Sequence, residues 1–271
     1  MVKPSRRKEV AQQALADRRI SIRLACQSVG ISETCYRYQP VMDRENQEVE
    51  AWLIKLTEKE SDWGFGLCFD YLRNVQGVSW NHKRVYRIYC ELALNLRIKP
   101  KRRLKRHAPE PLKEPIRPDQ VWSMDFMHDQ LSDGRSYRLF NVIDDYRREG
   151  LAIEAGFTLP AIRVIRVLEQ LLEWRSKPVV IRCDNGPEFI SAEFTSWASK
   201  HDIRIEYIQP GKPQQNAYIE RANRTIRHSW VSKHLFDNLE QVQDYATQWL
   251  WFYNNERPHK ANGGRPPLMA V

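Results

Sequence analysis

A short strand pattern in the second half of the chain ends in a carboxylate. Residues 179–183 read VVIRC, and Asp184 follows them directly before Asn185, Gly186 and Pro187. An apolar run of this length that is bounded by turn residues predicts a buried strand, and Asn-Gly-Pro cannot continue it. Asp184 is therefore either a turn-forming residue or a ligand presented at the tip of a strand.

The segments around this strand alternate between two periodicities. Residues 120–129, 137–146, 150–157, 178–184 and 203–209 have the pattern of strands, and residues 159–175, 188–200 and 213–230 have the pattern of helices. The resulting order, β-β-β-α-β-α-β-α, predicts an α/β fold in which a mixed sheet carries helices on both faces.

The N-terminal part is helical in pattern. Helices are expected at residues 6–16, 21–29 and 33–38, with Gly30 in a turn and Ser32 as an N-cap. This order resembles a helix-turn-helix, whose last helix would offer Arg37 to a DNA groove. A plain three-helix bundle would have the same pattern, so that alternative stays open. Helical periodicity continues through residues 46–96.

A proline-rich stretch separates the two styles of sequence. It contains Pro100, Pro109, Pro111, Pro115 and Pro118. We therefore expect an all-α DNA-binding region at residues 1–99, a basic linker at 100–118, and an α/β catalytic core with a C-terminal tail at 119–271.

The excess of positive over negative charge is confined to the first part of the chain. Residues 1–119 contain 24 Lys and Arg against 15 Asp and Glu, and the net charge of the whole chain is +9. Within residues 97–106, seven of ten side chains are basic, among them Lys101, Arg102 and Arg103. Such a run suits the phosphates of a nucleic acid, although a solvated linker would have the same composition.

Several classes of protein are excluded by composition. No apolar run approaches the roughly 18 residues of a membrane span, and the charged N-terminus lacks the apolar region of a secretory signal. The 5 cysteines are scattered without CxxC spacing, which argues against zinc and for a reducing compartment. We therefore expect a cytoplasmic protein that does not contact a membrane.

Three acidic residues are candidates for one site. Asp125 lies near the end of the first predicted strand, Asp184 ends the fourth, and Glu220 lies on the helix at 213–230. Carboxylates brought together at the carboxyl ends of strands repel one another unless a cation lies between them, and carboxylate oxygens suit Mg²⁺ or Mn²⁺. Taken singly, each acid could also be an ordinary strand-end, turn or helix-surface residue.

The same helix also presents a basic stripe. Arg224 and Arg227 follow Glu220 at i+4 and i+7, so the three side chains share one face of the helix. Arginines beside a metal-binding carboxylate are suited to phosphodiester chemistry with two ions, which activate a water or a 3′-hydroxyl. The alternative is that both arginines pair with acids of the core, such as Glu188 or Glu193.

The motifs WSMDFM, CDNGPEF and GKPQQNAYIERANRTIR, with 35 residues between Asp184 and Glu220, resemble those of the DDE recombinases in the retroviral-integrase superfamily. More narrowly, the chain is similar to the second-frame (OrfB) transposases of bacterial insertion sequences of the IS-three family. The resemblance extends from about residue 64 to 258 and includes NHKRVYRIY and YNNERPH. It implies a ribonuclease-H-like core and DNA strand transfer with two divalent ions.

The resemblance also assigns roles to single residues. It implies that Asp125, Asp184 and Glu220 form the metal-binding and catalytic triad, and that Asn185 and Gly186 belong to the active-site signature. The positions that would contact DNA ends are Lys212, Gln215 and Asn216. The sequence departs from the family at Ala222, where Phe is common, and in the C-terminal tail HKANGGRPP.

The family also implies partners. They are the terminal inverted repeats of the element, the target DNA, further copies of the chain on DNA, and an upstream-frame (OrfA) partner or frameshifted fusion, in the nucleoid of a bacterial cytoplasm. Two other functions remain open from the sequence: a DNA-binding regulatory copy without catalysis, and a plain ribonuclease-H-type nuclease. His128 is expected to be a surface residue, and the aromatic stretch WLWFYNNERPH is expected to pack in the core or to stack on a base.

Overall fold

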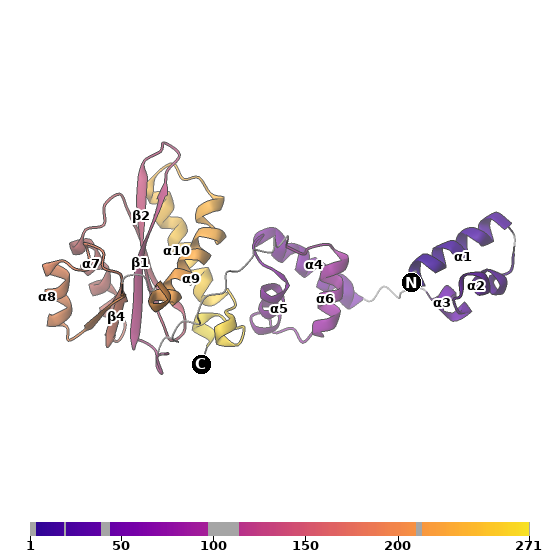
Figure 1. Ribbon diagram of the computed structural model, residues 1–271, viewed down its shortest axis with the longest axis horizontal. Helices are drawn as coiled ribbons and strands as arrows, with labels where there is room; N and C mark the ends of the chain where they lie inside the picture. Colours follow the sequence, from indigo (N-terminus) through magenta and orange to yellow (C-terminus); the bar gives the residue numbers. More distant parts are fainter. Residues whose placement is uncertain (1–3, 19, 39–43, 97–113, 210–212, 271) are drawn as a thin grey trace. The chain divides into compact units, whose positions relative to one another are not determined.

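The structure is a computed structural model that describes residues 4–18, 20–38, 44–96, 114–209 and 213–270. Contacts divide the chain into two compact units, Met1–Val49 and Glu50–Val271. Figure 1 shows the elements of both units in ribbon form. Each unit is described by itself.

The first unit contains three helices, α1 (Pro4–Arg18), α2 (Ile22–Val29) and α3 (Glu33–Arg37). The Ser21 side chain caps α2, and Gly30 ends that helix with a φ of 67°, a conformation that costs glycine little. The Ser32 side chain accepts the first hydrogen bond of α3 from the Cys35 N–H. The three predicted helices are confirmed, whereas their role in DNA binding remains a prediction.

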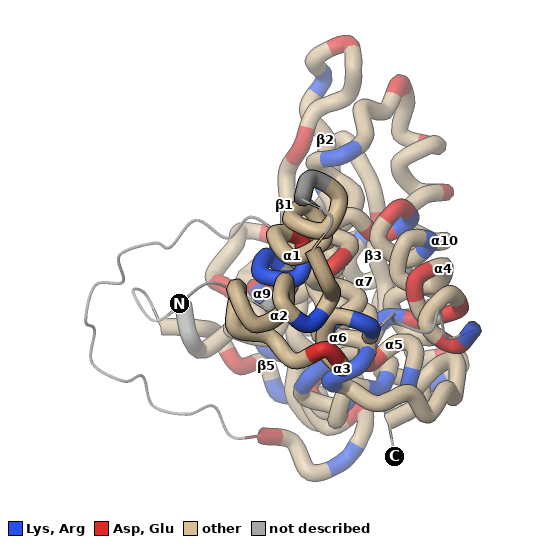
Figure 2. The backbone as a smooth tube through the Cα atoms, turned by 90° about the vertical axis from the view of Figure 1, so that its right-hand side faces the viewer, with Lys and Arg blue, Asp and Glu red and all other residues tan. Residues whose placement is uncertain are grey.

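Three more helices precede the predicted linker. They are α4 (Arg44–Lys59), α5 (Phe65–Asn74) and α6 (His82–Glu91). The Asn81 side chain caps α6, whose buried face consists of Val85, Ile88 and Tyr89. Its basic residues, Lys83, Arg84 and Arg87, lie in its first two turns. Figure 2 marks the Lys and Arg positions of the described residues in blue.

The boundary between the two compact units falls at Val49, because α5 and the residues before it pack against C-terminal elements. The expected linker at 100–118 stays a prediction, since most of it lies outside the described residues. The buried Trp63 stacks on Phe252 with 5.9 Å between ring centroids, and the Asp62 carboxylate pairs with the Lys233 ammonium at 2.6 Å. Residues 97–113, with Lys101, Arg102 and Arg103, lie outside the described part of the chain.

The core of the second unit is a five-stranded sheet. Its strands are β1 (Val121–Gln130), β2 (Ser136–Asp144), β3 (Glu149–Gly156), β4 (Val180–Cys183) and β5 (Arg204–Tyr207), in the spatial order β3-β2-β1-β4-β5. The β1–β2 and β2–β3 pairs are antiparallel, and the β1–β4 and β4–β5 pairs are parallel. The predicted mixed sheet is confirmed.

Helices cover both faces of this sheet (Figure 1). Helices α7 (Ala161–Leu172) and α8 (Ala192–Lys200) pack on one face, and α9 (Ala217–Ser229) and α10 (Leu239–Asn255) pack on the other. Leu139 and Phe140, neighbours in β2, belong to opposite hydrophobic clusters, as the alternation of side chains along a strand requires.

Two features of the C-terminal region differ from expectation. The helix predicted at 213–230 begins with a 3-10 helix, η1 (Pro213–Asn216), and α9 starts only at Ala217. The expected aromatic stretch belongs to α10, a helix that the sequence patterns did not identify. Its Trp249 and Tyr253 are buried, which confirms the core-packing alternative for these two rings, while Trp251 is 59% exposed.

The C-terminal tail folds back onto the second unit. After a second 3-10 helix, η2 (Val231–Lys233), the chain ends with η3 (Lys260–Asn262) and η4 (Pro267–Met269), and His259 forms a bridge with Arg265. Gly264 has a φ of 77°, and a Cβ there would lie 2.7 Å from the Asp70 carboxyl carbon. The Asn74 amide donates to the Gly264 carbonyl at 2.6 Å, so the atypical tail fastens α5 to the core.

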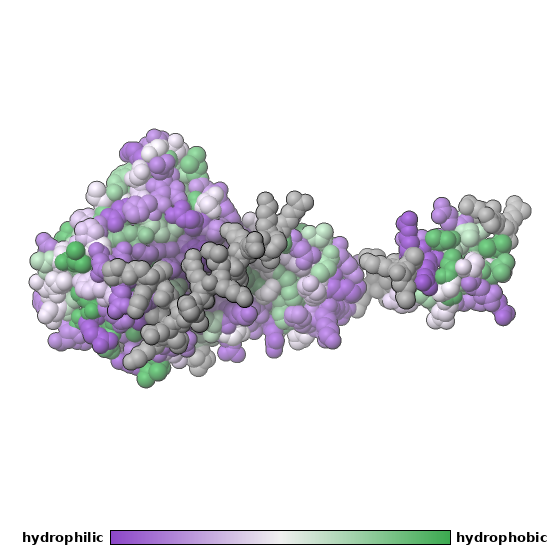
Figure 3. Space-filling view, viewed as in Figure 1, coloured by the Kyte–Doolittle hydropathy of each residue, from purple (hydrophilic) through white to green (hydrophobic). Residues whose placement is uncertain are grey.

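The surface of the second unit is mixed. On the face shown in Figure 3, hydrophobic spots over the sheet and its helices are small and separated by hydrophilic surface. His128 is exposed, as expected. In the described part of the chain, every helix is too short or too polar to cross a membrane.

Candidate active site

Two of the predicted acids lie on neighbouring parallel strands. Asp125 is in β1, opposite Asn141 of β2, and Asp184 directly follows β4. The β1–β4 register pairs Ser123 with Arg182, so its continuation by two residues sets Asp125 beside Asp184. The strand order therefore delivers both carboxylates to the same place, at the carboxyl end of β4.

An amide relay holds the Asp125 carboxylate. Its Oδ1 accepts from the Phe126 N–H, and its Oδ2 accepts from Nδ2 of Asn223, both at 2.8 Å. The Asn223 Oδ1 in turn accepts from Nδ2 of the buried Asn141 at 2.8 Å. Neither Asn223 nor Asn141 was predicted from the sequence to belong to the site. The signal for Asn223 was its position three residues after Glu220, on the same helix face.

The electrostatics of Asp125 connect all three acids. The pKa of the Asp125 carboxyl is raised to about 6, chiefly by burial and in addition by the nearby negative charges of Asp184 and Glu220. The hydrogen bonds from Phe126 and Asn223 offset part of this increase. The three carboxylates therefore share one electrostatic environment, in which the ionised form of Asp125 is disfavoured.

The turn behind Asp184 is built around its side chain. The Gly186 N–H donates to Oδ1 of Asp184 at 3.0 Å, and the Asn185 amide donates to the Ile208 carbonyl at 3.1 Å. A Cβ at Gly186 would lie 3.0 Å from the same Oδ1, so glycine allows the close approach. Asn185 and Gly186 thus fix the strand tip in the way that a sharp turn beside a functional carboxylate needs.

Glu220 lies in the first turn of α9, just after η1. The buried Asn216 side chain donates to the Met124 carbonyl of β1 at 3.5 Å, and Gln215 Oε1 accepts from the Gln209 N–H at 2.7 Å. These two bonds connect the start of the helix to the sheet. The third position expected to contact DNA, Lys212, lies outside the described residues.

The two arginines that follow Glu220 differ in their surroundings. The Arg227 guanidinium pairs with the Asp129 carboxylate at 3.0 Å and donates to the His128 carbonyl at 2.9 Å. Arg224 is exposed and forms no ion pair with any side chain that the structure describes. Pairing with an acid of the core is therefore found for Arg227 and not for Arg224, and the partner is Asp129 instead of the Glu188 or Glu193 given as examples; Glu188 pairs with Arg138.

The three acids provide only oxygen donors for a metal ion. Carboxylate oxygens are the ligands that Mg²⁺ and Mn²⁺ prefer, and Asp125, Asp184 and Glu220 supply them in one environment. Within the described ranges, however, no group of three or more His, Cys, Asp or Glu side chains is already gathered closely enough to hold an ion. The chemistry of the donors fits a divalent cation, and the three side chains do not form a closed cage by themselves.

The chain is similar to known proteins over the region that contains the three acids. Two family models, both described as integrase core domain, match residues 115–213 and 201–267. These ranges include the five strands and α9, and therefore all three acids. The intasome structure of simian T-cell lymphotropic virus matches with a TM-score of 0.51 at 18% identity, covering 80% of this chain and 73% of that one, which supports the fold.

Two relatives match most of the chain. An uncharacterised 39.2 kDa protein of insertion element IS476 from Xanthomonas euvesicatoria is 35% identical over 98% of this chain and 77% of its own length. An uncharacterised 31.7 kDa protein of insertion element IS407 from Burkholderia multivorans is 35% identical over 89% of this chain and 87% of its own. A putative transposase of insertion element IS150 from Escherichia coli is 24% identical over 71% of this chain and 72% of its own length. With its integrase core, its ribonuclease-H-like sheet and these relatives, the chain belongs to the DDE-type, IS-three-like transposases of bacterial insertion sequences, which are polynucleotidyl transferases of the integrase superfamily.

Proposed function

We propose that this transposase cleaves and joins DNA at the terminal inverted repeats of its own insertion sequence, with two Mg²⁺ or Mn²⁺ ions held by Asp125, Asp184 and Glu220. The observation that carries the proposal is the β1–β4 register, which sets Asp125 beside Asp184, with Glu220 on α9 near enough for its charge to act on Asp125. Acids in such an arrangement are stabilised by a cation that lies between them.

The residues of the chain have separate tasks in this proposal. Asn223 orients the Asp125 carboxylate, Asn141 orients Asn223, and the Gly186 N–H fixes the Asp184 carboxylate. Glu220, on the first turn of α9, completes the ligand set by turning its side chain toward the other two acids. When bound, divalent ions supply an activated water or 3′-hydroxyl and stabilise the leaving oxygen.

The DNA contacts in the proposal come from basic and polar groups around this edge. Arg224 is exposed and would bind a phosphate next to the scissile bond, with Gln215 and Asn216 of η1 and Arg227, one turn beyond Arg224, as further contacts. Lys212, which lies outside the described residues, is proposed as a contact from the sequence alone. Arg37 of α3 and the basic run with Lys101, Arg102 and Arg103 would contact DNA away from the chemistry. Transposition also requires two element ends, so we expect several copies of the chain, with or without an upstream-frame partner, on the DNA.

The test is strand transfer of a labelled duplex that carries one inverted repeat of the element, in Mg²⁺, by the wild type and by the variant Asp184→Asn. This change keeps the shape of the side chain and removes its charge. We expect transfer by the variant to fall to the level without protein, while its thermal unfolding and its affinity for the duplex stay close to those of the wild type.

Asp202→Asn is a matched control. Asp202 lies in the turn before β5 and is 88% exposed, and the substitution removes the same charge from the same unit. The control is expected to retain full transfer. Wild-type transfer rates from Asp184→Asn would refute the triad. Absence of transfer by the wild type with normal DNA binding would instead favour the regulatory, non-catalytic alternative.

A further inference from the structure

The face of α9 that points away from the three acids lines a basic hollow of about 240 Å³. Its lining contains the cationic or imidazole side chains of Arg148, Arg221, Arg257, His259 and Lys260. No Asp or Glu lines it among the residues that the structure describes. We call these five residues the basic hollow. A cavity lined by one sign of charge concentrates ions of the opposite sign.

The position on α9 separates the basic hollow from the acids. Tyr218, Arg221 and Thr225 of α9 line the hollow, and these three recur at helical spacing along one face. Glu220 and Asn223, in contrast, belong to the side of the helix that meets Asp125. A single helix thus presents a carboxylate to one site and cations to another.

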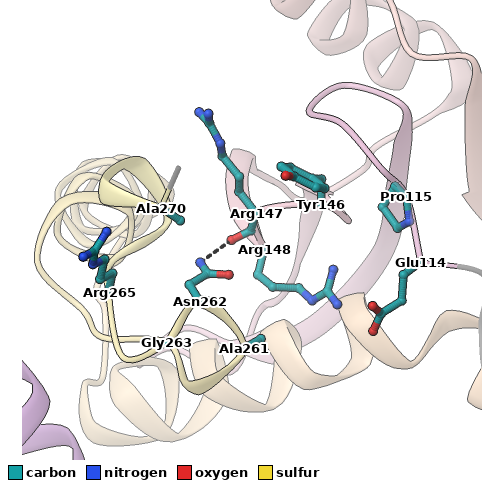
Figure 4. A pocket seen from close by; sticks show the side chains of 10 residues that line it. All are labelled: Glu114, Pro115, Tyr146, Arg147, Arg148, Ala261, Asn262, Gly263, Arg265 and Ala270. Carbon is teal, nitrogen blue, oxygen red and sulfur yellow. Dashed lines mark hydrogen bonds between the residues drawn. The ribbon is translucent and has the colours of Figure 1, made fainter.

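A larger hollow of about 620 Å³ adjoins the first one, since Arg148 and Ala261 line both. It adds the cations Arg147 and Arg265 and one acid, Glu114. Figure 4 shows the Arg148 side chain extending toward Glu114, while the Arg147 side chain points away from it. The C-terminal tail shapes this hollow, because the Asn262 amide donates to the Arg147 carbonyl at 2.8 Å.

Several nitrogen atoms of the basic hollow are buried without a hydrogen-bond partner. They are Nη1 of Arg148, Nε of Arg257 and Nε2 of His259. Buried donors without acceptors are rare in proteins, and each such group needs an explanation. The two guanidinium nitrogens are donors, whereas the His259 nitrogen donates in only one tautomer of the neutral ring. Two such donors around one cavity, on residues that are otherwise held by the fold, indicate that an acceptor from outside the chain completes the site.

The surrounding charges favour an anion as that acceptor. The pKa of His259 is lowered to about 3, chiefly by burial and in addition by the positive charges of Arg257 and Arg148, so the ring is neutral at pH 7. Burial also lowers the pKa of Arg257. The charges of Asp62 and Glu60 raise this pKa and so offset part of the effect of burial. Asp62, however, is already paired with Lys233 at 2.6 Å. Asp70 acts on Lys260 and Glu60 on Arg257, so the four cations of the hollow, Arg148, Arg221, Arg257 and Lys260, outnumber these two acids.

Arg148 is also oriented for planar recognition. Its guanidinium carbon lies 3.5 Å from the centre of the Tyr218 ring, on which the group stacks. Stacking occupies the flat face of a guanidinium and leaves its in-plane N–H groups for hydrogen bonds, which match the oxygens of a phosphate.

We propose that the basic hollow binds a backbone phosphate of DNA, as a second DNA contact on the opposite side of α9 from the three acids. The proposal takes from the proposed function only that DNA is the substrate. The phosphate oxygens would accept hydrogen bonds from Arg148 and Arg257, and the exposed Arg221 and Lys260 would attract the strand at the mouth of the hollow.

The main test is the salt dependence of duplex binding by the full chain in EDTA, where no metal-dependent step takes place. The double variant Arg221→Gln/Lys260→Gln removes two exposed cations of the hollow. We expect the slope of log affinity against log salt concentration to become shallower by up to about 2. The matched control, Arg166→Gln/Lys200→Gln, removes two exposed cations from α7 and α8 and is expected to leave the slope unchanged.

A second measurement separates DNA phosphate from a small free anion and from a general surface effect. Inorganic phosphate, compared with chloride at equal ionic strength, is expected to raise the thermal midpoint of the wild type but not that of Arg257→Met. The methionine keeps apolar packing at this position and removes the buried charge, so the variant is expected to fold.

The combined outcomes decide the proposal. A shallower slope together with stabilisation by phosphate that requires Arg257 supports it. Stabilisation by phosphate with an unchanged slope would identify a small-anion site and overturn the DNA assignment. A shallower slope without any effect of phosphate would assign Arg221 and Lys260 to a surface contact and overturn the hollow as a site, as would no change in either measurement. Because EDTA blocks the chemistry, none of these outcomes depends on the role of the three acids.

Discussion

Asp125 and Asp145 are two acids of the same sheet region that have opposite surroundings. Burial raises the pKa of each carboxyl to about 6. Asp145 is fully buried and pairs with the guanidinium of Arg182 at 2.8 Å. Asp125 has an amide and a backbone N–H as partners, and the other charges that act on it are the carboxylates of Asp184 and Glu220.

The difference distinguishes an acid that serves the fold from one that we propose as a metal ligand. A buried carboxylate that serves the fold has its cation within the chain, as Asp145 has in Arg182. A carboxylate that serves chemistry is held in position by neutral groups, so that its charge remains for a cation from solution. Pairing, more than burial or pKa, therefore distinguishes the two roles.

The largest expected effect comes from breaking the structural pair. Arg182→Met leaves the Asp145 carboxylate buried without its cation, which costs about 3–5 kcal/mol of the free energy of unfolding. Urea titration followed by circular dichroism measures this loss. The double variant Arg182→Met/Asp145→Leu removes both charges and is expected to recover most of it. A single variant as stable as the wild type would show that the pair does not hold the fold.

The same kind of change at the functional acid is expected to have the opposite sign. Asp125→Asn removes a buried carboxylate that two like charges surround, and we expect a gain of about 1–3 kcal/mol in the free energy of unfolding at pH 7.5 without divalent ions. A loss of stability at this pH would contradict the account of Asp125.

The pH dependence gives this prediction a second check. The folded pKa of Asp125 is about 6, above the unfolded value near 3.9, so the penalty of its ionised form is fully present above pH 6 and is lost as the pH falls below about 4. The difference in stability between Asp125→Asn and the wild type should therefore shrink between pH 6 and pH 4. A difference that stays constant across this window would contradict the raised pKa.

A smaller effect compares two cations of one helix. Arg227 already pairs with Asp129, whereas Arg224 is exposed. Arg224→Ala should make the salt dependence of DNA binding shallower by about 1 and leave stability unchanged. Arg227→Ala should cost about 0.5 kcal/mol of unfolding free energy and change the salt slope less. Equal slope changes in the two variants would restore the expectation that both arginines bind phosphate alike.

The sheet and the position of Asp184 at a strand end could be predicted because their signals are local. Asp125 was expected near the end of β1 but lies in its middle, because β1 extends to Gln130 in its pairing with β2. Alternating apolar residues define β1 to β3, and the Asn-Gly-Pro turn marks the end of β4 near Asp184. The turn residues fix where a strand stops, and the α/β order fixes that these ends meet at one edge.

The rest depends on contacts between distant residues. The pairing of Arg227 with Asp129 spans 98 positions, and that of Asn74 with Gly264 spans 190. Periodicity within a segment carries no information on such pairs. The same reason explains why the boundary at Val49 was not found, since it follows from packing of Trp63 on Phe252 and not from the prolines.

Binding of Mn²⁺, counted by electron paramagnetic resonance in the wild type and in Asp184→Asn, tests most directly whether the unpaired acids form the metal site. Asp202→Asn serves as the matched control for the loss of one negative charge. We expect the wild type and Asp202→Asn to bind Mn²⁺ alike, with up to two ions per chain once the element-end duplex is present, and Asp184→Asn to lose this binding. Equal Mn²⁺ binding by all three proteins would contradict the account.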